Sequence, residues 1–435
     1  MNLNNVYNAG DFKGKKGIDK IQKAIDTAQN ETERRTIIIP PEGPDQNGYW
    51  LLDRSIKVPE NTLLILNNCY LYLEDKTNDN IITNKDHQNR TGNIHLLGWG
   101  KPRLNGNAAN QDRTGNRFMF GIHLVRVDDF SIKNIEIGPT NAWGISLEDV
   151  SRGEIENIRF KQDGKTHNQD GVTLPGPADE INIKNIFGDT GDDSVALNAV
   201  SRKDRPSHKK LPQFNGGSIT NVNIENVQTR VVDSGNNIRL LCGDDYIVKN
   251  IRINGVKSLP DNKASSLLLC GNASRYAKKM PTSETFTDIF ASDLHRTSGD
   301  NERLIWLDSP LGTLKLSNLS IKGSWKKVIH QEDSEHKVDL LKISDLVVKR
   351  SDNNSGEIFN FNDKVKHLII NDIMVEKADC ILTGKGNILN ASFQGWNTNN
   401  CKNIFKVQGK IKGVCSQLYN DSKCINKLPS QLKMK

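Results

Sequence analysis

The feature that most constrains how this chain folds is a short motif that returns along most of its length. In each copy an Asn or Asp stands among Ile, Val or Leu residues that alternate with other residues. Successive copies start roughly 20 to 40 residues apart, a range that indicates stacked structural repeats. The copies read NIHLLG (93–98), FSIKNIEIG (130–138), GEIENIRF (153–160), INIKNIFG (181–188), SITNVNIENV (218–227), IVKNIRINGV (247–256), TFTDIFASDL (285–294), LKLSNLSIKG (314–323), LLKISDLVVK (340–349) and HLIINDIMVE (367–376).

Alternation with a period of two predicts short strands, and the Gly, Asn and Asp residues between them predict tight turns. Strands that repeat in this way favour an all-β solenoid, a right-handed parallel β-helix whose coils stack about 4.8 Å apart. A β-propeller is the main competitor, but its blades repeat more evenly and usually carry aromatic markers. We therefore predict the β-helix. The recurring Asn134, Asn157, Asn185, Asn226 and Asn250 are expected to stack their amides at one turn of successive coils.

One clear amphipathic helix precedes the repeats. In residues 17–30, Ile18, Ile21, Ile25 and Ala28 recur at helical spacing, and the buried strand TIIIPPEG (36–43) follows. The open ends of a β-helix need covering, so we expect this helix to cap the first coil. The predicted organisation is an N-terminal cap (1–60), a β-helix that carries the active-site groove (61–415) and a C-terminal tail (416–435).

Composition narrows the class of protein. Only 35% of the residues are hydrophobic, as expected for a thin, heavily solvated body, and the net charge of +7 is modest and scattered. No basic run is interleaved with aromatic residues, so nucleic acid is not the predicted partner.

The seven cysteines match neither a dense disulfide framework nor a metal motif, which favours buried or free thiols. We find no signal peptide and no membrane span, so the expected location is extracellular or virion-associated by a signal-free route, or cytoplasmic.

A carboxylate pair stands at the start of one predicted rung. Asp192 and Asp193 occur in GDDSVALN (191–198), and Asp170 occurs in HNQDGVTL (167–174), about one coil earlier. Stacking therefore predicts that Asp170 and Asp192 occupy equivalent positions on neighbouring coils. Asn168 and Asp170 are two residues apart, so both should point to one face of an extended segment. Arg239, about two coils further on, is expected on the same face.

Crowded carboxylates suit acid–base chemistry. Mutual repulsion raises the pKa of at least one member of such a cluster. A protonated carboxyl beside an ionised one is the pair that inverting glycoside hydrolysis needs, with the two groups roughly 6.5–9.5 Å apart. Arg239 is suited to hold a substrate carboxylate or sulfate by paired hydrogen bonds. Aspartate pairs are also common in turns, and the second pair, Asp244 and Asp245, fits that plainer explanation.

These motifs resemble those of polygalacturonases, the family 28 glycoside hydrolases. The N-x-D element is Asn168-Gln169-Asp170, the G-D-D element is Gly191-Asp192-Asp193, and an R-I-K-like element is Arg239-Leu240-Leu241. The opening segments GIDKIQKAIDTA (17–28), TIIIPPEG (36–43) and TLLILNNCYLYLE (62–74) resemble the wider pectate-lyase-like superfamily. The resemblance implies Asp192 as the general acid, Asp170 and Asp193 as the water-activating pair, and Arg239 as a substrate-binding residue.

Two departures from the family pattern concern the substrate. The G-H-G element is missing, because the corresponding region reads FNGGSIT (214–220), and Leu241 replaces the lysine of R-I-K. A basic insertion, AVSRKDRPSHKKLPQF (199–214), brings Arg202 and His208 to this part of the chain, and His167 adjoins the N-x-D element. We expect Asn168 and these three residues to help bind substrate, and the substrate to be an acidic or decorated polysaccharide other than plain polygalacturonate.

Alternatives remain open at this point. A lyase on the same fold would use Ca²⁺ and a basic residue, with the aspartates as metal ligands. A non-catalytic β-helix would bind a surface glycan as an adhesin or phage tail protein, and a phage depolymerase would combine binding with cleavage. We favour the hydrolase, which needs no cofactor and no metal, as a monomer or a homotrimer. Trp143 and Trp306 are either sugar-stacking or core residues.

Overall fold

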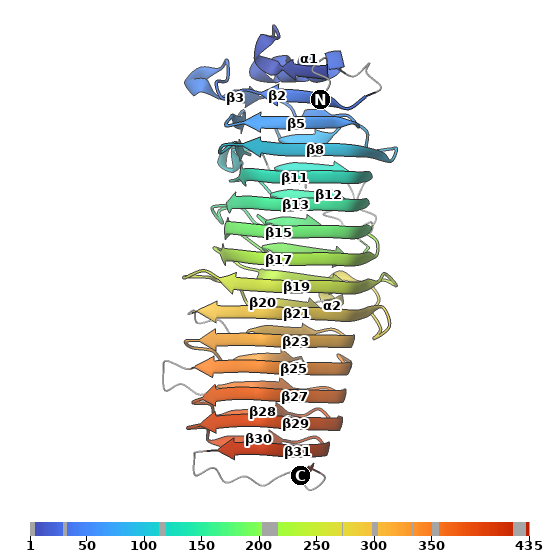
Figure 1. The fold of residues 1–435 in the computed structure, drawn as a ribbon, viewed down its shortest axis with the longest axis vertical. Coiled ribbons are helices and arrows are strands. Elements are labelled where there is room, and N and C mark those ends of the chain that lie inside the picture. Colours follow the sequence, from blue (N-terminus) through green and yellow to red (C-terminus); the bar gives the residue numbers. More distant parts are fainter. Residues whose placement is uncertain are drawn as a thin grey trace. The chain divides into compact units, whose positions relative to one another are not determined.

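The computed structural model of the protein describes residues 5–28, 33–112, 119–201, 216–271, 273–297, 303–332, 335–349, 356–420 and 432–434. The predicted fold class is confirmed: the chain is a right-handed parallel β-helix with a short helix near its N-terminus. Long strands of one sheet run parallel to one another, and the chain passes through a second sheet before it returns to the first (Figure 1). Right-handed crossovers are the sterically favoured way to make such a connection.

The chain divides into two compact units, Met1–Asn223 with Val231–Asp233, and Ile224–Arg230 with Ser234–Lys435. In the first unit, one sheet holds the long rungs and a second sheet holds shorter strands. The first sheet contains β1 (Val6–Asn8), β2 (Arg35–Ile39), β5 (Thr62–Asn67), β8 (Thr91–Trp99), β11 (Val127–Ile137), β13 (Val150–Lys161), β15 (Ala178–Thr190) and the short β3 (Trp50–Leu52), β6 (Tyr70–Leu73) and β9 (Arg103–Asn105). The second contains β4 (Ile56–Val58), β7 (Ile82–Asn84), β10 (Ile122–Val125), β12 (Ile145–Glu148), β14 (Val172–Leu174) and β16 (Val195–Ala199).

The second unit is built in the same way. Its long rungs are β19 (Val248–Ser258), β21 (Phe286–Thr297), β23 (Leu311–Lys322), β25 (Val338–Lys349), β27 (Val365–Glu376), β29 (Ile388–Asn399) and β31 (Ile411–Asn420). Its shorter strands are β18 (Asn236–Cys242), β20 (Ser266–Gly271), β22 (Ile305–Asp308), β24 (Lys327–Gln331), β26 (Glu357–Phe361), β28 (Cys380–Gly384) and β30 (Asn403–Val407). Strand β17 (Ile219–Val231) contributes residues to both units. β31 continues to Asn420 and pairs with β32 (Leu432–Met434), so strand pairing extends into the residues we expect to form a tail.

The recurring Asn explains why the motif is not a plain alternation. In β11, Phe130 and Ile132 are buried, but the next buried residues are Ile135 and Ile137, so the pattern shifts by one residue at Asn134. Asn134 has a φ of 60°, in the left-handed region that Asn tolerates better than most residues. The motif is therefore two short extended segments joined at a corner. The same conformation recurs at Asn157, Asn185, Asn226 and Asn250.

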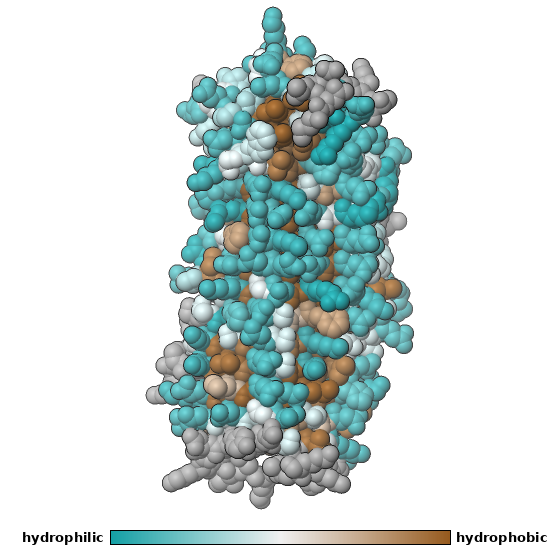
Figure 2. All heavy atoms as spheres, in the orientation of Figure 1, coloured by the Kyte–Doolittle hydropathy of each residue, from teal (hydrophilic) through white to brown (hydrophobic). Residues whose placement is uncertain are grey.

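The predicted stacking of Asn amides is present from Asn134 through Asn157 to Asn185. The Asn157 side-chain amide donates to Asn134 Oδ1 at 2.9 Å, and that of Asn185 donates to Asn157 Oδ1 at 2.8 Å. Each amide thus finds its partner on the neighbouring coil, which satisfies its hydrogen-bonding capacity within the stack. The face drawn in Figure 2 is covered mainly by hydrophilic residues, with hydrophobic ones between them.

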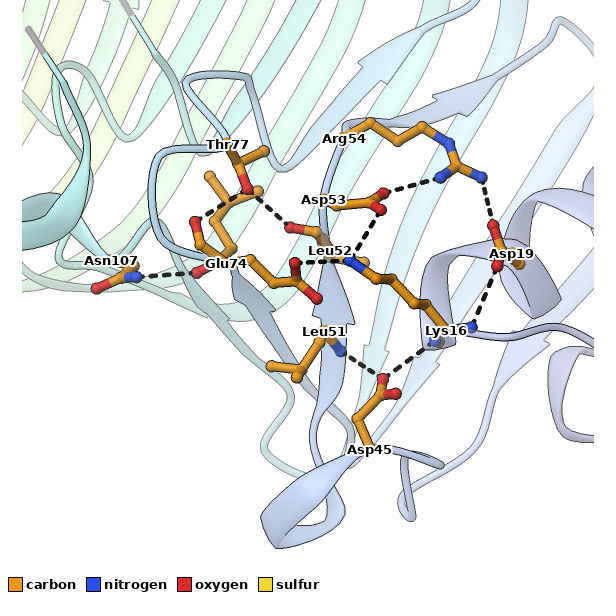
Figure 3. A network of polar contacts seen from close by, with 12 residues as sticks. Lys16, Asp19, Asp45, Leu51, Leu52, Asp53, Arg54, Glu74, Thr77 and Asn107 are labelled. Atoms are coloured by element: carbon orange, nitrogen blue, oxygen red, sulfur yellow. Dashed lines mark hydrogen bonds and ion pairs between the residues drawn. The ribbon is translucent and has the colours of Figure 1, made fainter.

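The N-terminal helix α1 (Gly17–Ala28) buries its predicted apolar face against the first strands of the fold. Salt bridges attach the start of the helix to the neighbouring coil (Figure 3). Lys16 Nζ lies 3.0 Å from Asp53 and 2.8 Å from Glu74. The Arg54 guanidinium contacts Asp19 at 2.7 Å and Asp53 at 2.8 Å. Among the described residues, the other helical elements are the single turn α2 (Ala273–Tyr276) and short 3-10 turns at Ala9–Asp11, Gln46–Gly48 and Ala108–Asn110.

The remaining sequence expectations concern cysteines and membrane spans. Cys69, Cys242, Cys270, Cys380 and Cys401 are buried thiols that form no disulfide. Burial raises the pKa of Cys69, Cys242 and Cys380 to about 12. Buried thiols of this kind are unreactive because the thiolate is disfavoured. Among the helices of the described residues, none has the length and apolar character to cross a membrane.

Candidate functional site

The three candidate carboxylates lie just before two neighbouring short strands, β14 and β16. The Gly171 amide donates to the Asp193 carbonyl at 2.9 Å, and the Val172 amide donates to the Ser194 carbonyl at 3.0 Å. With Val172 opposite Val195, this register places Asp170 opposite Asp193. The prediction that Asp192 is the partner of Asp170 is therefore wrong by one residue. One coil is a residue longer than the separation of Asp170 and Asp192, so Asp192 lies opposite Gln169.

A glycine permits this close stacking. A Cβ at Gly171 would meet the Ser194 carbonyl oxygen at 2.3 Å, far inside van der Waals contact. The residue after Asp170 must therefore lack a side chain for the two coils to approach, since adjacent strands lie about 4.8 Å apart. The glycine of the N-Q-D-G sequence thus fixes the distance between the Asp170 and Asp193 backbones.

The carboxylates differ in exposure and in hydrogen bonding. Asp170 and Asp193 are buried, with 4% and 1% of their surfaces exposed, whereas Asp192 is half-buried. Asp170 Oδ2 accepts a hydrogen bond from the Thr173 hydroxyl at 3.0 Å. Asp192 Oδ1 accepts one from the Asp193 amide at 2.9 Å. The half-buried Asp192 is thus held at the edge of a buried pair.

A residue that sequence reasoning passed over, Gln169, fixes the segment before Asp170. It is fully buried, and its Oε1 accepts from the Gly164 amide at 2.8 Å. Its amide nitrogen donates to the Thr140 carbonyl at 2.7 Å and to Asp163 at 3.1 Å. The sequence does hold a signal for it, because Gln169 is the middle residue of the N-x-D element.

The neighbours of Gln169 on its N-terminal side face solvent. Asn168 is exposed and has a φ of 60°, so the segment is a turn. The prediction that Asn168 and Asp170 share one face of an extended strand is therefore wrong, because a left-handed residue breaks the alternation. The His167 side chain is 89% exposed, and its Nδ1 lies 3.8 Å from Asp233.

Arg239 lies in β18 of the second unit. It is 9% exposed, and its guanidinium carbon lies 4.3 Å from the centre of the Tyr276 ring in α2, a cation–π contact. Leu240 and Leu241, which follow it, are fully buried. Two further candidates, Arg202 and His208, lie outside the described residues.

The plainer interpretation holds for several other residues. Trp143 is 3% exposed and stacks on Phe120 with ring centres 5.2 Å apart, so it is a core residue. The Trp306 ring lies 4.1 Å from the Arg303 guanidinium carbon. The pair Asp244 and Asp245 has positive φ at both residues, and Asp244 accepts from a backbone amide at 2.7 Å, which makes the pair a turn. The described residues contain no group of three or more His, Cys, Asp or Glu arranged to hold a metal ion.

One face of the second sheet in the first unit is polar although it is buried. Its register aligns Thr83, His123, Ser146 and Thr173 on consecutive strands, and each is at most 5% exposed. Burial lowers the pKa of His123 to about 3, so its ring is neutral at pH 7. Convergent polar groups that lead to a carboxylate pair are typical of a binding site.

Fold and site together define a β-helix with a carboxylate cluster at its short-strand sheet. The family model described as glycosyl hydrolases family 28 matches residues 70–208, a segment that includes Asp170, Asp192 and Asp193. Over these residues the chain is similar to that family of glycosyl hydrolases. No curated protein sequence matches it.

Solved structures show the same fold. The tailspike protein of E. coli bacteriophage HK620, solved in complex with a pentasaccharide, is 13% identical with a TM-score of 0.62, over 96% of this chain and 74% of that one. A double mutant of that tailspike aligns over 99% of this chain and 78% of its own, with a TM-score of 0.66 and 13% identity. An exopolygalacturonase from Thermotoga maritima is 12% identical with a TM-score of 0.51, over 89% of this chain and 91% of that one. The likeness shows the fold, and the family match supports a polysaccharide-degrading β-helix.

Proposed function

We propose that this protein is a glycoside hydrolase that cleaves an acidic or decorated polysaccharide with inversion of configuration. The observation that carries the proposal is the register of Asp170 and Asp193 on adjacent coils, with the half-buried Asp192 beside them. The match to a family of glycosyl hydrolases spans the same residues. Three carboxylates in this arrangement supply an acid and a base at one edge of a sheet.

The exposure of each carboxylate suggests its role. Asp192 is the most accessible of the three, so it is the group placed to donate a proton to the glycosidic oxygen. Asp170 and Asp193 then act as the pair that holds and activates the attacking water. Thr173 donates to one oxygen of Asp170, which orients that carboxylate toward its task.

The basic residues suggest an anionic substrate. Arg239 rests against the Tyr276 ring, which holds the guanidinium plane in a fixed orientation for paired hydrogen bonds to a carboxylate or sulfate. Asn168 and His167 are exposed and close to Asp170 in the sequence. We propose that these two residues, together with Arg202 and His208, contact the sugar chain. The protein would act outside the cell or as part of a virion.

A second candidate function is glycan binding as a phage tail protein. It is favoured by the likeness to a tailspike solved with a bound pentasaccharide. A tail protein that cleaves its receptor would satisfy both proposals, as a monomer or a homotrimer. A lyase on the same fold is the enzymatic rival.

A panel of acidic plant and bacterial-surface glycans, incubated with the protein and followed by sizing of the products, tests these proposals. Hydrolysis predicts new reducing ends, and nuclear magnetic resonance of the fresh product should show an inverted anomeric configuration. A lyase would instead give an unsaturated product with ultraviolet absorbance. Binding to a glycan without any shortening of it would contradict the hydrolase and support the tail protein.

A further inference from the structure

A pocket of about 680 Å³ lies in the first unit, lined by β4, β7 and the segment that follows β7. The lining residues that matter most are Lys57, Thr83, Lys85, His87 and Thr91. Nothing in the family match or the tailspike likeness assigns it a ligand. Its volume falls in the range of small-ligand sites, which are usually formed before the ligand arrives.

Hydrogen bonds hold the walls of this pocket in place. The Asp86 carboxylate accepts from the Gln88 amide at 2.8 Å and from the Asn89 amide at 3.0 Å, which fixes the turn after β7. Asn84 bonds to both the amide and the carbonyl of Val125 at 2.9 Å. Arg35, which also lines the pocket, donates to the carbonyl oxygens of Ala28 and Glu60. The pocket is therefore preorganised, which reduces the entropic cost of binding.

Two polar groups that line the pocket have bonding capacity left. Within the described part of the chain, the Lys57 ammonium forms no ion pair and no hydrogen bond. Its charge lies close enough to His87 to help lower the pKa of that imidazole. Thr91 Oγ1 is buried and has no hydrogen-bond partner there either. A buried hydroxyl left without a partner costs free energy unless a ligand or water completes it.

The charges in the pocket favour an anion. Its cations Arg35, Lys57 and Lys85 outnumber its carboxylates, Asp86 and Glu60, and the Asp86 oxygens already accept the bonds of the turn. Lys85 Nζ lies 3.6 Å from Asp26 on the N-terminal helix, whereas Lys57 remains available.

Apart from Val58 and Pro59, the rest of the wall is polar and uncharged. Burial lowers the pKa of His87, so its ring is neutral at pH 7. His87 Nε2 lies 2.8 Å from the Thr83 hydroxyl, which itself donates to the His123 carbonyl. Lys57 therefore offers its cation to a ligand beside hydroxyl and imidazole groups, whose chemistry matches that of sugar hydroxyls.

We propose that this pocket binds an acidic sugar unit of the glycan, held by Lys57 and lined by Thr83, His87 and Thr91. The choice of a sugar as the occupant rests on the function proposed above. The site binds at a distance from the carboxylates. Lys57 lies opposite Thr83, and β7 is separated by β10 and β12 from β14, the strand that follows Asp170. At the usual strand spacing, that separation is about 14 Å.

The test uses the full chain carrying Asp192→Asn, so that cleavage does not consume the probe. Galacturonate and glucuronate oligomers are titrated by calorimetry, with their methyl esters as neutral counterparts of similar shape. We expect Lys57→Gln to weaken binding of an acidic oligomer about tenfold and to affect binding of its ester much less, since the neutral ester forms no ion pair with the ammonium. Thr91→Val, which removes the hydroxyl at constant shape, should weaken both. Lys342→Gln, which replaces an exposed lysine in β25, is the matched control and should change neither.

Hydrogen exchange locates the bound oligomer, and we expect added protection in residues 83–91. Absence of binding by every acidic oligomer, equal affinity of Lys57→Gln and its parent, or protection elsewhere would overturn the inference. The two proposals fail separately. If the wild-type protein cleaves no glycan but its Asp192→Asn variant binds through Lys57, the hydrolase is wrong and the pocket stands. Cleavage without any contribution of Lys57 to binding would instead support the hydrolase and overturn the pocket.

Discussion

Asp170 and Asp193 lie opposite each other on adjacent coils, joined through the 2.9 Å bond from the Gly171 amide to the Asp193 carbonyl. The same register continues toward the N-terminus through Trp143 and Phe120, whose rings stack. The carboxylate pair therefore occupies the same column of coil positions as a part of the aromatic core. The same column of coil positions thus holds aromatic core residues in earlier coils and the candidate carboxylates in later ones.

The first prediction concerns Asp192, the accessible carboxyl. Asp192→Asn should lower the rate of glycan cleavage by about 10²–10⁴-fold, the usual contribution of a general acid, because an amide cannot donate the required proton. The side-chain oxygen that accepts from the Asp193 amide is kept, so the fold should not change. Reducing-end release measures the rate, and circular dichroism during heating checks the fold.

Asp345→Asn is the matched control for this variant. Asp345 is an exposed residue in β25 with a φ of 57°, a conformation that Asn also adopts, so both activity and stability should match the wild type. If the Asp192→Asn variant cleaves the glycan at the wild-type rate, Asp192 is not the general acid.

A second prediction separates positioning from chemistry. Gln169→Leu keeps the size of the side chain but removes the acceptor of the Gly164 amide and one of the two donors to the Thr140 carbonyl, which keeps the Thr166 hydroxyl. Leaving the Gly164 amide unsatisfied costs about 1–3 kcal/mol and losing the bond to Thr140 costs about 1 kcal/mol, so the free energy of unfolding should fall by about 2–4 kcal/mol. Cleavage should fall as well, because the turn before Asp170 is no longer held.

Gln169→Glu provides the contrasting variant. It keeps an oxygen acceptor for the Gly164 amide, but it places a buried carboxylate oxygen against the Thr140 carbonyl and the Asp163 carboxylate, so it should be at least as destabilised as Gln169→Leu. Denaturant unfolding gives the order. Equal stability of all three proteins would show that Gln169 does not anchor this segment.

Much of the fold follows from the sequence, for a physical reason. Each Asn-centred motif encodes its own two segments and corner, so local patterns such as 130–138 specify a rung without knowledge of distant contacts. The amphipathic helix at 17–28 is predictable on the same local grounds. Trp143 is ambiguous in the sequence, because an aromatic residue beside a glycine fits either a core or a sugar platform until its neighbour Phe120 is known.

The register of the site is not predictable with the same accuracy. A shift of one residue decides whether Asp192 or Asp193 faces Asp170, and that shift depends on the length of the turn between the coils. The turn at Asn168 has a left-handed residue, which the sequence alone does not reveal. Local patterns specify strands, whereas turn geometry determines which side chains meet.

The third prediction concerns the Asn stack. Asn157 has a φ of 56°, and its amide both donates to Asn134 and accepts from Asn185. Asn157→Val places a β-branched residue in the left-handed region, which costs roughly 1–2 kcal/mol before the lost hydrogen bonds are counted. Asn157→Gly loses the same bonds without that strain and should be less destabilising. Urea midpoints compare the two, and a valine variant as stable as the glycine variant would contradict the role of the corner.

The last prediction concerns the salt bridge that attaches the N-terminal helix. Asp19 accepts from Arg54 at 2.7 Å and from the Lys16 amide at 3.1 Å (Figure 3). The pKa of Asp19 is lowered below its usual 3.8, mainly by the hydrogen bond from Arg54 and next by the one from the Lys16 amide. A group with a lowered folded-state pKa stabilises the fold above its unfolded pKa and loses that contribution as the pH falls through the folded value.

Asp19→Asn should therefore reduce the free energy of unfolding near pH 7, and the difference from the wild type should shrink below about pH 4. One third of the Asp19 side chain is exposed (34%), so solvent screening limits the effect to less than about 1 kcal/mol. Asp26→Asn, on the same helix with its nearest cation 3.6 Å away, should change stability less at pH 7. Urea unfolding at each pH measures both variants. A difference for Asp19→Asn that persists unchanged at low pH would show that the carboxylate charge plays no part in holding the helix, because the charge is gone there while the shape of the side chain remains.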